Sequence, residues 1–183
     1  MATSGTTTFD LSIDDIIEEA YERCGVRTSS GYDLKSARRS LNIMFSEWGN
    51  RGVHLWKVEL KEQLLTAGTR TYTAPSNAND VLEAYISTTT GLSTSTNEVS
   101  LTKISRSEYA ALPNKGAQGQ PSQYYVDRQT TPTITLYLTP DASTYTYLKY
   151  YYLKRLEDAG AYTNQADVVF RFIPCMVAGL AYY

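Results

Sequence analysis

The stretch RFIPCMVAGLAYY, residues 171–183, decides the organisation predicted for this chain. Its apolar side chains recur at the i, i+3, i+4, i+7 and i+8 spacing of a half-buried helix. They are Ile173, Met176, Val177, Leu180 and Ala181. No Gly or Asn cap and no downstream Pro closes the pattern, as such residues close most helices. We therefore expect either that a further segment follows or that another subunit completes the apolar face.

Two more amphipathic helices are predicted near the other end of the chain. The first runs from Ser12, a capping residue, to Cys24, and Gly25 closes it. The second runs from its cap Asp33 to about Trp48. Their apolar stripes are Ile13, Ile16, Ile17, Ala20, Tyr21 and Cys24, and Leu34, Ala37, Leu41, Met44, Phe45 and Trp48. Each helix has one face to bury, so the terminal helices are expected to pack together.

The period of the sequence changes from helical to alternating at residue 54. Strands are predicted over 54–60, 69–73, 81–89, 99–102, 124–126, 133–138 and 144–153. A turn at Ala67-Gly68 predicts a hairpin between the first two. Ser105 and Glu108 have the spacing of a capping box, which predicts one short helix that ends before Pro113.

These elements predict an α+β fold in which an antiparallel β-sandwich or barrel-like domain is inserted into a bundle of terminal helices. Residues 9–52 form the N-terminal helical pair, and residues 54–156 form the β-domain. A C-terminal helix over 167–183 packs on the pair.

Composition and charge indicate a globular chain without a strong attraction to nucleic acid or lipid. The chain has 183 residues, is 42% hydrophobic and 20% charged, and carries a net charge of -2. No apolar run approaches about 18 residues, so no membrane contact is expected. Residues 1–8 do not resemble a secretion signal. The sixteen tyrosines against four phenylalanines favour strands with one wet face and surfaces that pack against partners.

No pattern in the sequence indicates catalysis or a cofactor. The single histidine, His54, would need Cys24 and Cys175 to form a zinc site, and their spacing gives no support. Ser–His–Asp chemistry lacks its GxSxG turn. Carboxylates near predicted strands could form a hydrolase pair, although such side chains are usually solvated. They are Glu59, Glu62, Asp80 and Glu83.

Several short motifs follow one another in a recognisable order. They are CGV at 24–26, LNIM at 41–44, EW at 47–48, Trp56 with Gly68 and Tyr72, ISRSEY at 104–109, GQPSQYY at 119–125, ITLYLTP at 134–140, LKRLEDAG at 153–160, and residues 171–183. In this order the chain resembles the head-to-tail adaptor proteins of tailed phages, the ring beneath the portal. The Ser/Thr-rich segment 88–97 departs from the pattern and receives no role.

The resemblance implies a structural virion protein, made in the host bacterial cytoplasm, without enzymatic activity. Twelve copies would form a ring that joins the portal protein to the tail nozzle or tube, and double-stranded DNA would pass through its lumen. A weakly charged channel suits a duplex that must slide.

Site residues follow from this expectation. The portal interface is predicted at Arg171, Phe172, Ile173, Met176, Leu180, Tyr182 and Tyr183. The subunit interface is predicted at Arg38, Arg39, Trp48, Arg51 and Trp56. For the two tryptophans, the alternative interpretation is that they fill the junction between helices and sheet, which is the more usual role of such residues. Lys103 and Arg106 are predicted to face the lumen, or simply water.

Two other classes of protein remain open. A carbohydrate- or ligand-binding β-module of a virion or surface protein would show an exposed aromatic platform on a stable monomer. A small hydrolase would show clustered carboxylates with perturbed pKa values in a cleft.

Overall fold

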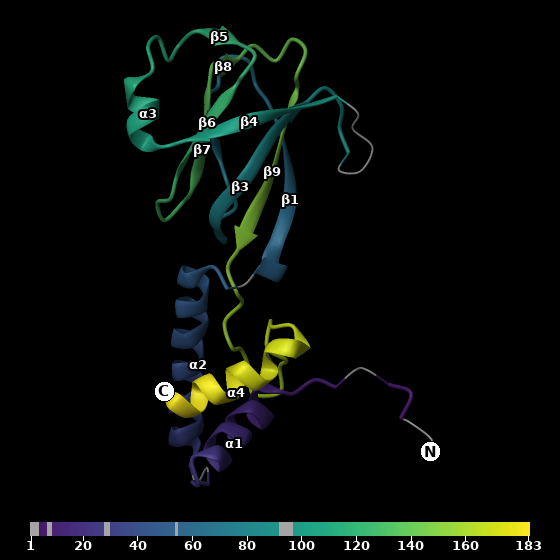
Figure 1. Ribbon diagram of the computed structural model, residues 1–183, viewed down its shortest axis with the longest axis vertical. Helices are drawn as coiled ribbons and strands as arrows, with labels where there is room; N and C mark the ends of the chain where they lie inside the picture. Colours follow the sequence, from purple (N-terminus) through teal and green to yellow (C-terminus); the bar gives the residue numbers. More distant parts are fainter. Residues whose placement is uncertain (1–3, 7–8, 28–29, 54, 92–96) are drawn as a thin grey trace. The chain divides into compact units, whose positions relative to one another are not determined.

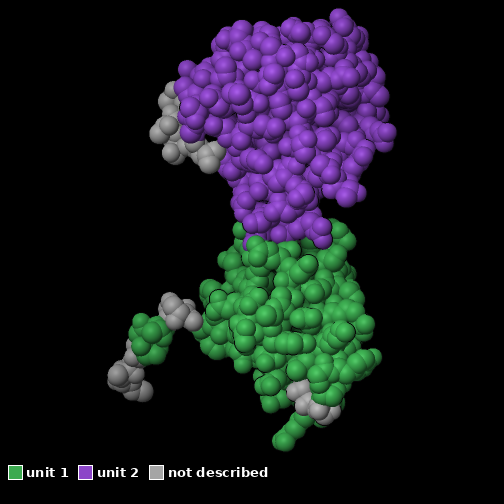
Figure 2. All heavy atoms as spheres, turned by 180° about the vertical axis from the view of Figure 1, so that it is seen from behind, with its two compact units in different colours: residues 1–56, 156–183 green, residues 57–155 purple. Residues whose placement is uncertain are grey.

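A computed structural model describes residues 4–6, 9–27, 30–53, 55–91 and 97–183 of the chain. It divides into two compact units (Figure 2). The helical unit comprises residues 1–56 and 156–183, and the β unit comprises residues 57–155. The chain therefore builds the helical unit from both of its ends and the β unit from its middle.

The helical unit contains α1 (Ile13–Arg23), α2 (Gly31–Arg51) and α4 (Ile173–Tyr182) (Figure 1). A 3₁₀ turn, η2 (Phe170–Phe172), precedes α4, and Pro174 lies in the first turn of α4, where its missing N–H costs nothing. All three helices contribute to one buried cluster. It consists of Ile13, Ile16, Ile17, Ala20, Ala37, Leu41, Met44, Phe45, Ala159, Ile173, Met176, Val177 and Leu180. The apolar stripe of residues 171–183 is thus buried within this chain.

The start of the second helix differs from the prediction. The cap is Ser30, and Asp33 is the third residue of α2. The Ser30 hydroxyl accepts a hydrogen bond from the Asp33 N–H at 3.4 Å, while the Asp33 carboxylate accepts one from the Ser30 N–H at 3.1 Å. Both residue types cap helices, and this reciprocal pair satisfies two amide groups instead of one. At the other end, Gly52 takes the left-handed conformation, with φ 68°.

The first strand of the β unit is β1 (Val58–Leu64). The 3₁₀ turn η1 (Leu55–Lys57) precedes it, so the predicted strand over 54–60 begins only at Val58. His54 lies outside the described residues. The other strands are β2 (Thr71–Thr73), β3 (Ala78–Ser87), β4 (Glu98–Ile104), β5 (Gln118–Gly119), β6 (Gln123–Asp127), β7 (Thr133–Tyr137), β8 (Thr139–Pro140) and β9 (Tyr147–Lys154). The short helix α3 (Arg106–Ala111) has the predicted capping box of Ser105 and Glu108.

Seven of these strands form one sheet in the order β1-β9-β3-β4-β6-β7-β2, and β5 pairs with β8. The predicted hairpin is wrong, because β1 pairs with β9 and β2 pairs with β7. The predicted antiparallel pairing fails at β4 and β6, and at β5 and β8, which are parallel. The sheet is a single curled half-barrel (Figure 1). The predicted α+β class is confirmed, and of the predicted sandwich or barrel-like domain the sheet shows the barrel-like curl.

The connection between β1 and β2 explains the curl. These strands are the two edges of the sheet, yet only seven residue steps separate Leu64 from Thr71. Seven steps reach about 25 Å at most. The edges of a flat seven-stranded sheet would lie about 29 Å apart. The sheet must bend to bring its edges within reach of this segment, whose turn is held by hydrogen bonds between Tyr72 and residues 66 and 69.

Tyrosines fill part of the concave core of the sheet. Tyr124, Tyr150 and Tyr152 are buried with Val81, Ile86, Ile134, Leu136 and Leu148. The Tyr124 hydroxyl donates to the Leu82 carbonyl at 3.1 Å, and the Tyr152 hydroxyl donates to Glu59 at 2.7 Å. Burial raises the pKa of each of the three phenols to about 12.

Candidate assembly surfaces

The residues predicted to contact the portal differ in burial, and one of them, Phe172, is half-buried. Ile173, Met176 and Leu180 belong to the core of the helical unit. Arg171, Tyr182 and Tyr183 are exposed, and Tyr182 keeps 90% of its surface. Phe170, 72% exposed, lies immediately before them and was not predicted. In the sequence, Phe170 could have been singled out because it is a large apolar residue that lies outside the apolar stripe, about one turn before Ile173.

The end of α4 is attached to α2 through Glu47. The Tyr183 hydroxyl and the Arg51 guanidinium both donate hydrogen bonds to the Glu47 carboxylate. The hydrogen bond from Tyr183 is the main reason why the pKa of Glu47 is lowered, and the same bond raises the pKa of Tyr183. Arg51, a predicted subunit-interface residue, is therefore already paired within the helical unit.

The two tryptophans pack on Phe172. The centroid of the Trp56 ring lies 4.7 Å from the centroid of the Phe172 ring. The centroid of the Trp48 ring lies 6.3 Å from the centroid of the Phe172 ring. Trp48 also contacts Phe45, at 6.2 Å. All these residues belong to the helical unit. The faces of the tryptophans that meet Phe172 are therefore buried inside one subunit.

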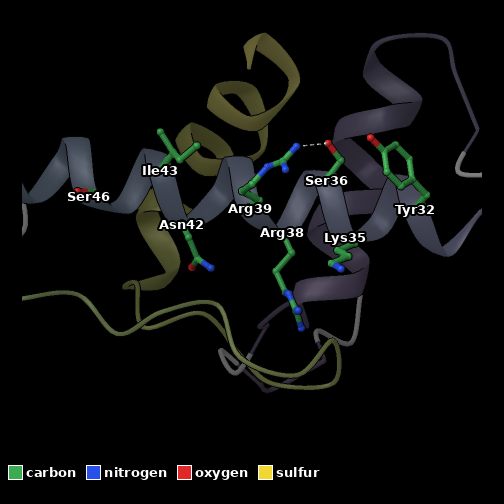
Figure 3. Close-up of a pocket in the computed structure, with 8 residues that line it drawn as sticks. All are labelled: Tyr32, Lys35, Ser36, Arg38, Arg39, Asn42, Ile43 and Ser46. Atoms are coloured by element: carbon green, nitrogen blue, oxygen red, sulfur yellow. Dashed lines mark hydrogen bonds between the residues drawn. The ribbon is translucent and has the colours of Figure 1, made fainter.

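A basic groove runs along the outer face of α2 (Figure 3). Its volume is about 500 Å³, and its lining is Tyr32, Lys35, Ser36, Arg38, Arg39, Asn42, Ile43 and Ser46. Arg38 donates to the Gly160 carbonyl at 3.2 Å and lies over the Tyr162 ring at 5.1 Å. Arg39 donates to the Ser36 hydroxyl at 3.3 Å. Among the described residues, no carboxylate pairs with Lys35, Arg38 or Arg39.

An acidic groove lies beside α1, on other residues of the helical unit. Its volume is about 440 Å³, and its lining is Phe9, Leu11, Asp15, Glu18, Glu19, Glu22, Arg23, Ile173, Pro174 and Val177. Asp15 serves the cap of α1, and hydrogen bonds from Ser12 lower the pKa of Asp15. Glu19 pairs with Arg23 at 2.9 Å. Within the described part of the chain, Glu18 and Glu22 have no cationic partner. Neither of these two residues was predicted as a site residue.

The residues predicted to face a lumen have different environments. The Lys103 ammonium lies 3.0 Å from the Asp80 carboxylate, which also accepts a bidentate pair of hydrogen bonds from Arg128. Burial would raise the pKa of Asp80, but the hydrogen bonds from Arg128 and Lys103 outweigh burial, so its pKa is lowered. Arg106 is exposed at the start of α3. Asp80 thus compensates part of the cationic charge near Lys103.

The carboxylates considered for hydrolysis are each engaged by a different partner. Glu59 accepts hydrogen bonds from Tyr152 and Lys154, and these lower its pKa. Glu62 accepts the Gly91 N–H, and Glu83 accepts the Tyr85 hydroxyl. The pKa values of Glu59 and Asp80 are both lowered, so neither of these two carboxyls is suited to act as a protonated general acid near neutral pH. Across the described ranges, no three His, Cys, Asp or Glu side chains form a group that could hold a metal ion. His54, which the zinc site considered above would require, lies outside these ranges.

An exposed aromatic platform is not found in the described part of the β unit. Among its large hydrophobic side chains, the exposed ones are Leu64, Leu82 and Tyr151, and Tyr151 keeps only 38% of its surface. Tyr109 and Tyr125 stack on each other at 5.7 Å, but both are half-buried. The abundant tyrosine therefore serves the core of the sheet and pairs of side chains on its surface.

The comparison with protein families identifies the class to which these units belong. The family model described as SU10 adaptor protein matches residues 5–183. The chain belongs to this family, and its resemblance to phage head-to-tail adaptors is confirmed. No curated protein matches the chain. Of the helices described, none is both long and apolar enough to cross a membrane.

Proposed function

We propose that this protein is a structural, non-enzymatic head-to-tail adaptor that forms a ring between the portal and the tail nozzle or tube of a phage. The match of the adaptor family over residues 5–183 is the observation that carries the proposal. Genomic DNA passes through the lumen of the ring, and the protein is a component of the virion, made in the host cytoplasm. The resemblance to head-to-tail adaptors implies twelve copies, and closed symmetry of this kind is usual for assemblies of identical subunits.

The helical unit is proposed to act as a bundle that carries the assembly contacts. Its three long helices share one core, so their outer faces are fixed relative to each other and can present preformed surfaces. A ring of identical subunits needs two different, complementary surfaces on each subunit. The basic groove of α2 and the acidic groove beside α1 are two such surfaces on non-overlapping sets of residues.

The portal contact is proposed at the exposed side chains that flank the buried stripe of α4. Phe170 and Tyr182 are 72% and 90% exposed, and Arg171 is exposed between Phe170 and the helix. Exposed aromatic side chains beside an arginine are the residue types that dominate binding energy in protein interfaces. Lys103 and Arg106 are proposed to face the lumen. Because Asp80 pairs with Lys103, DNA meets a weakly attractive wall there.

A test of the portal contact must leave the core of α4 intact. Truncation from Ile173 onward would remove buried residues of the helical unit, so lost binding would not distinguish unfolding from a lost contact. The variant Phe170→Ser/Tyr182→Ser changes only exposed side chains. We expect it to fold normally and to bind the portal ring of the same phage at least about 10-fold more weakly, as expected when interface anchors are lost.

Sedimentation of adaptor and portal mixtures measures this binding, and Leu64→Ser, an exposed change in the β unit, is the matched control. If the double variant binds as tightly as the wild type, the portal contact lies elsewhere. If the wild type neither forms a ring nor binds the portal, the adaptor function itself is contradicted.

A further inference from the structure

The two grooves of the helical unit are opposite in charge and comparable in size. The groove of α2 is lined by Lys35, Arg38 and Arg39 and has a volume of about 500 Å³. The groove beside α1 is lined by the four carboxylates Asp15, Glu18, Glu19 and Glu22 and has a volume of about 440 Å³. No residue lines both grooves.

The charged side chains that have no oppositely charged partner among the described residues show matching spacing on the two helices. On α1 they are Glu18 and Glu22, four residues apart. On α2 they are Lys35 and Arg39, also four residues apart. Four residues correspond to about 6 Å along a helix and to nearly one full turn, so each pair lies on one side of its helix. Two such helices laid alongside each other would pair both charges at once.

Each groove also offers an exposed apolar side chain close to its charges. Phe9 is 71% exposed beside the acidic groove. Tyr32 and Ile43 are 76% and 52% exposed along the basic groove, and Figure 3 shows them on α2 on either side of Arg39. Interfaces combine apolar anchors of this kind with complementary charges, and the charges set register and exclude wrong pairings.

We propose that the occupant of the basic groove of α2 is the α1 helix of a second copy of this chain, with Glu18 and Glu22 of one copy facing Lys35 and Arg39 of the next. This inference rests on the proposed ring and identifies the surfaces that close it. The contact is head-to-tail, because each copy uses α2 on one side and α1 on the other, and such contacts generate rings. Arg38, already bound to the Gly160 carbonyl and the Tyr162 ring, shapes the groove.

Charge reversal on either helix tests the contact. The variant Glu18→Lys/Glu22→Lys makes both grooves basic, and the variant Lys35→Glu/Arg39→Glu makes both grooves acidic. Each variant alone should lose self-association by at least about 100-fold, because like charges then face each other. When the two variants are mixed in equal amounts, every contact again joins a basic surface to an acidic one. Assembly should therefore return, with the two variants alternating around the ring.

Analytical ultracentrifugation at low salt, without and with the cognate portal ring, measures assembly of the wild type, each variant and their mixture. Lys61→Glu/Arg70→Glu, a double reversal on the β unit, is the control for net charge. Circular dichroism confirms that the variants fold. The wild-type assembly should weaken at 0.5 M salt, because screening shortens the range of these charges.

Three results would overturn the proposal: single variants that assemble like the wild type, a mixture that stays dissociated, or a control that fails equally. Each leaves the adaptor function intact if the wild type still forms a ring. A wild type that assembles neither alone nor on the portal contradicts the adaptor function first, and the ring contact with it.

Discussion

At the scale of single residues, Gly179 shows how closely α4 approaches α2. A Cβ atom on Gly179 would lie 2.6 Å from the Met44 sulfur, well inside contact distance. Met44 is only 1% exposed, so its side chain has little space into which to move. In the interior of an isolated helix, Gly costs about 1 kcal/mol relative to Ala. Any larger residue at this position would require the Met44 side chain to shift, and this offsets the better helix propensity of other residues.

Gly179→Ala should destabilise the helical unit by about 1–3 kcal/mol, despite the better helix propensity of alanine, because it overpacks the core. Thermal unfolding followed by circular dichroism measures the change. Met44→Ala opens a cavity and is destabilising by itself. The double variant should nevertheless be more stable than the sum of the two losses predicts, since the new methyl group fills part of that cavity. Strict additivity, or a stabilised Gly179→Ala, would show that Met44 does not limit the approach.

At the scale of elements, strand β9 carries an ionisable side chain into the interior. Lys149 is 2% exposed, and its ammonium donates to the Gly91 carbonyl at 2.7 Å and to Glu98 at 3.0 Å. Glu62, its register partner on β1, lies 3.8 Å away and accepts the Gly91 N–H at 3.1 Å. One lysine thus connects β1, β4 and the backbone beside residue 91 on the face of β9 opposite Tyr150.

Lys149→Met should destabilise the β unit by about 1–3 kcal/mol, because two carboxylates then lose their shared cation while one of them is mostly buried. Urea unfolding monitored by tyrosine fluorescence reports this loss. Adding Glu62→Gln to Lys149→Met should recover part of it, because a neutral amide needs no counter-charge. A Lys149→Met variant as stable as the wild type would mean that the ion pairs contribute nothing beyond the cost of burying them.

The same elements show what the sequence could and could not predict. Local signals were sufficient for α3, with its capping box of Ser105 and Glu108. Pairing was not predictable: the Ala67-Gly68 turn exists, but the strands on either side of it go to opposite edges of the sheet. The residue types of a turn determine the local backbone conformation, whereas the strand with which each flanking strand pairs depends on contacts with residues distant in sequence.

For the candidate surfaces, the sequence indicates which helix faces are exposed but not what they bind. Arg38 and Arg39 lie off the buried stripe of α2 and line a groove, while their role at a subunit interface stays a prediction. Ile173, Met176 and Leu180 were expected at an interface because nothing in a single sequence shows that α1 and α2 already cover their face. The acidic groove was missed, since it combines residues of α1 with Phe9 and the start of α4.

At the scale of the whole molecule, the two units should respond differently to alkaline pH. Tyr124, Tyr150 and Tyr152, with pKa values of about 12, all belong to the β unit. An unfolded tyrosine ionises near pH 10. Between pH 10 and 12 the folded β unit therefore holds protons that the unfolded chain has lost, and its stability falls as the pH rises.

Unfolding of the β unit should therefore set in between pH 10 and 12, with phenolate absorbance rising together with the loss of strand signal in circular dichroism. Tyr150→Phe should move this transition to higher pH at little cost near neutrality. The Tyr150 hydroxyl is buried and has no hydrogen-bond partner among the described residues, so its removal breaks no contact. Complete ionisation of the tyrosines near pH 10 with the sheet intact would contradict the assignment of these phenols to the core.

The arrangement of the chain in the β unit has a consequence for how such proteins can diversify. Its first and last strands are antiparallel neighbours, and Val58 faces Leu153 across the ladder. Such paired residues lie about 5 Å apart. The segment between Trp56 and Leu156 therefore behaves as a cassette whose two ends meet at one point. A recombination event could replace it with any other cassette whose ends lie equally close, leaving the helical unit complete. Ring formation and whatever the cassette contacts could then evolve separately.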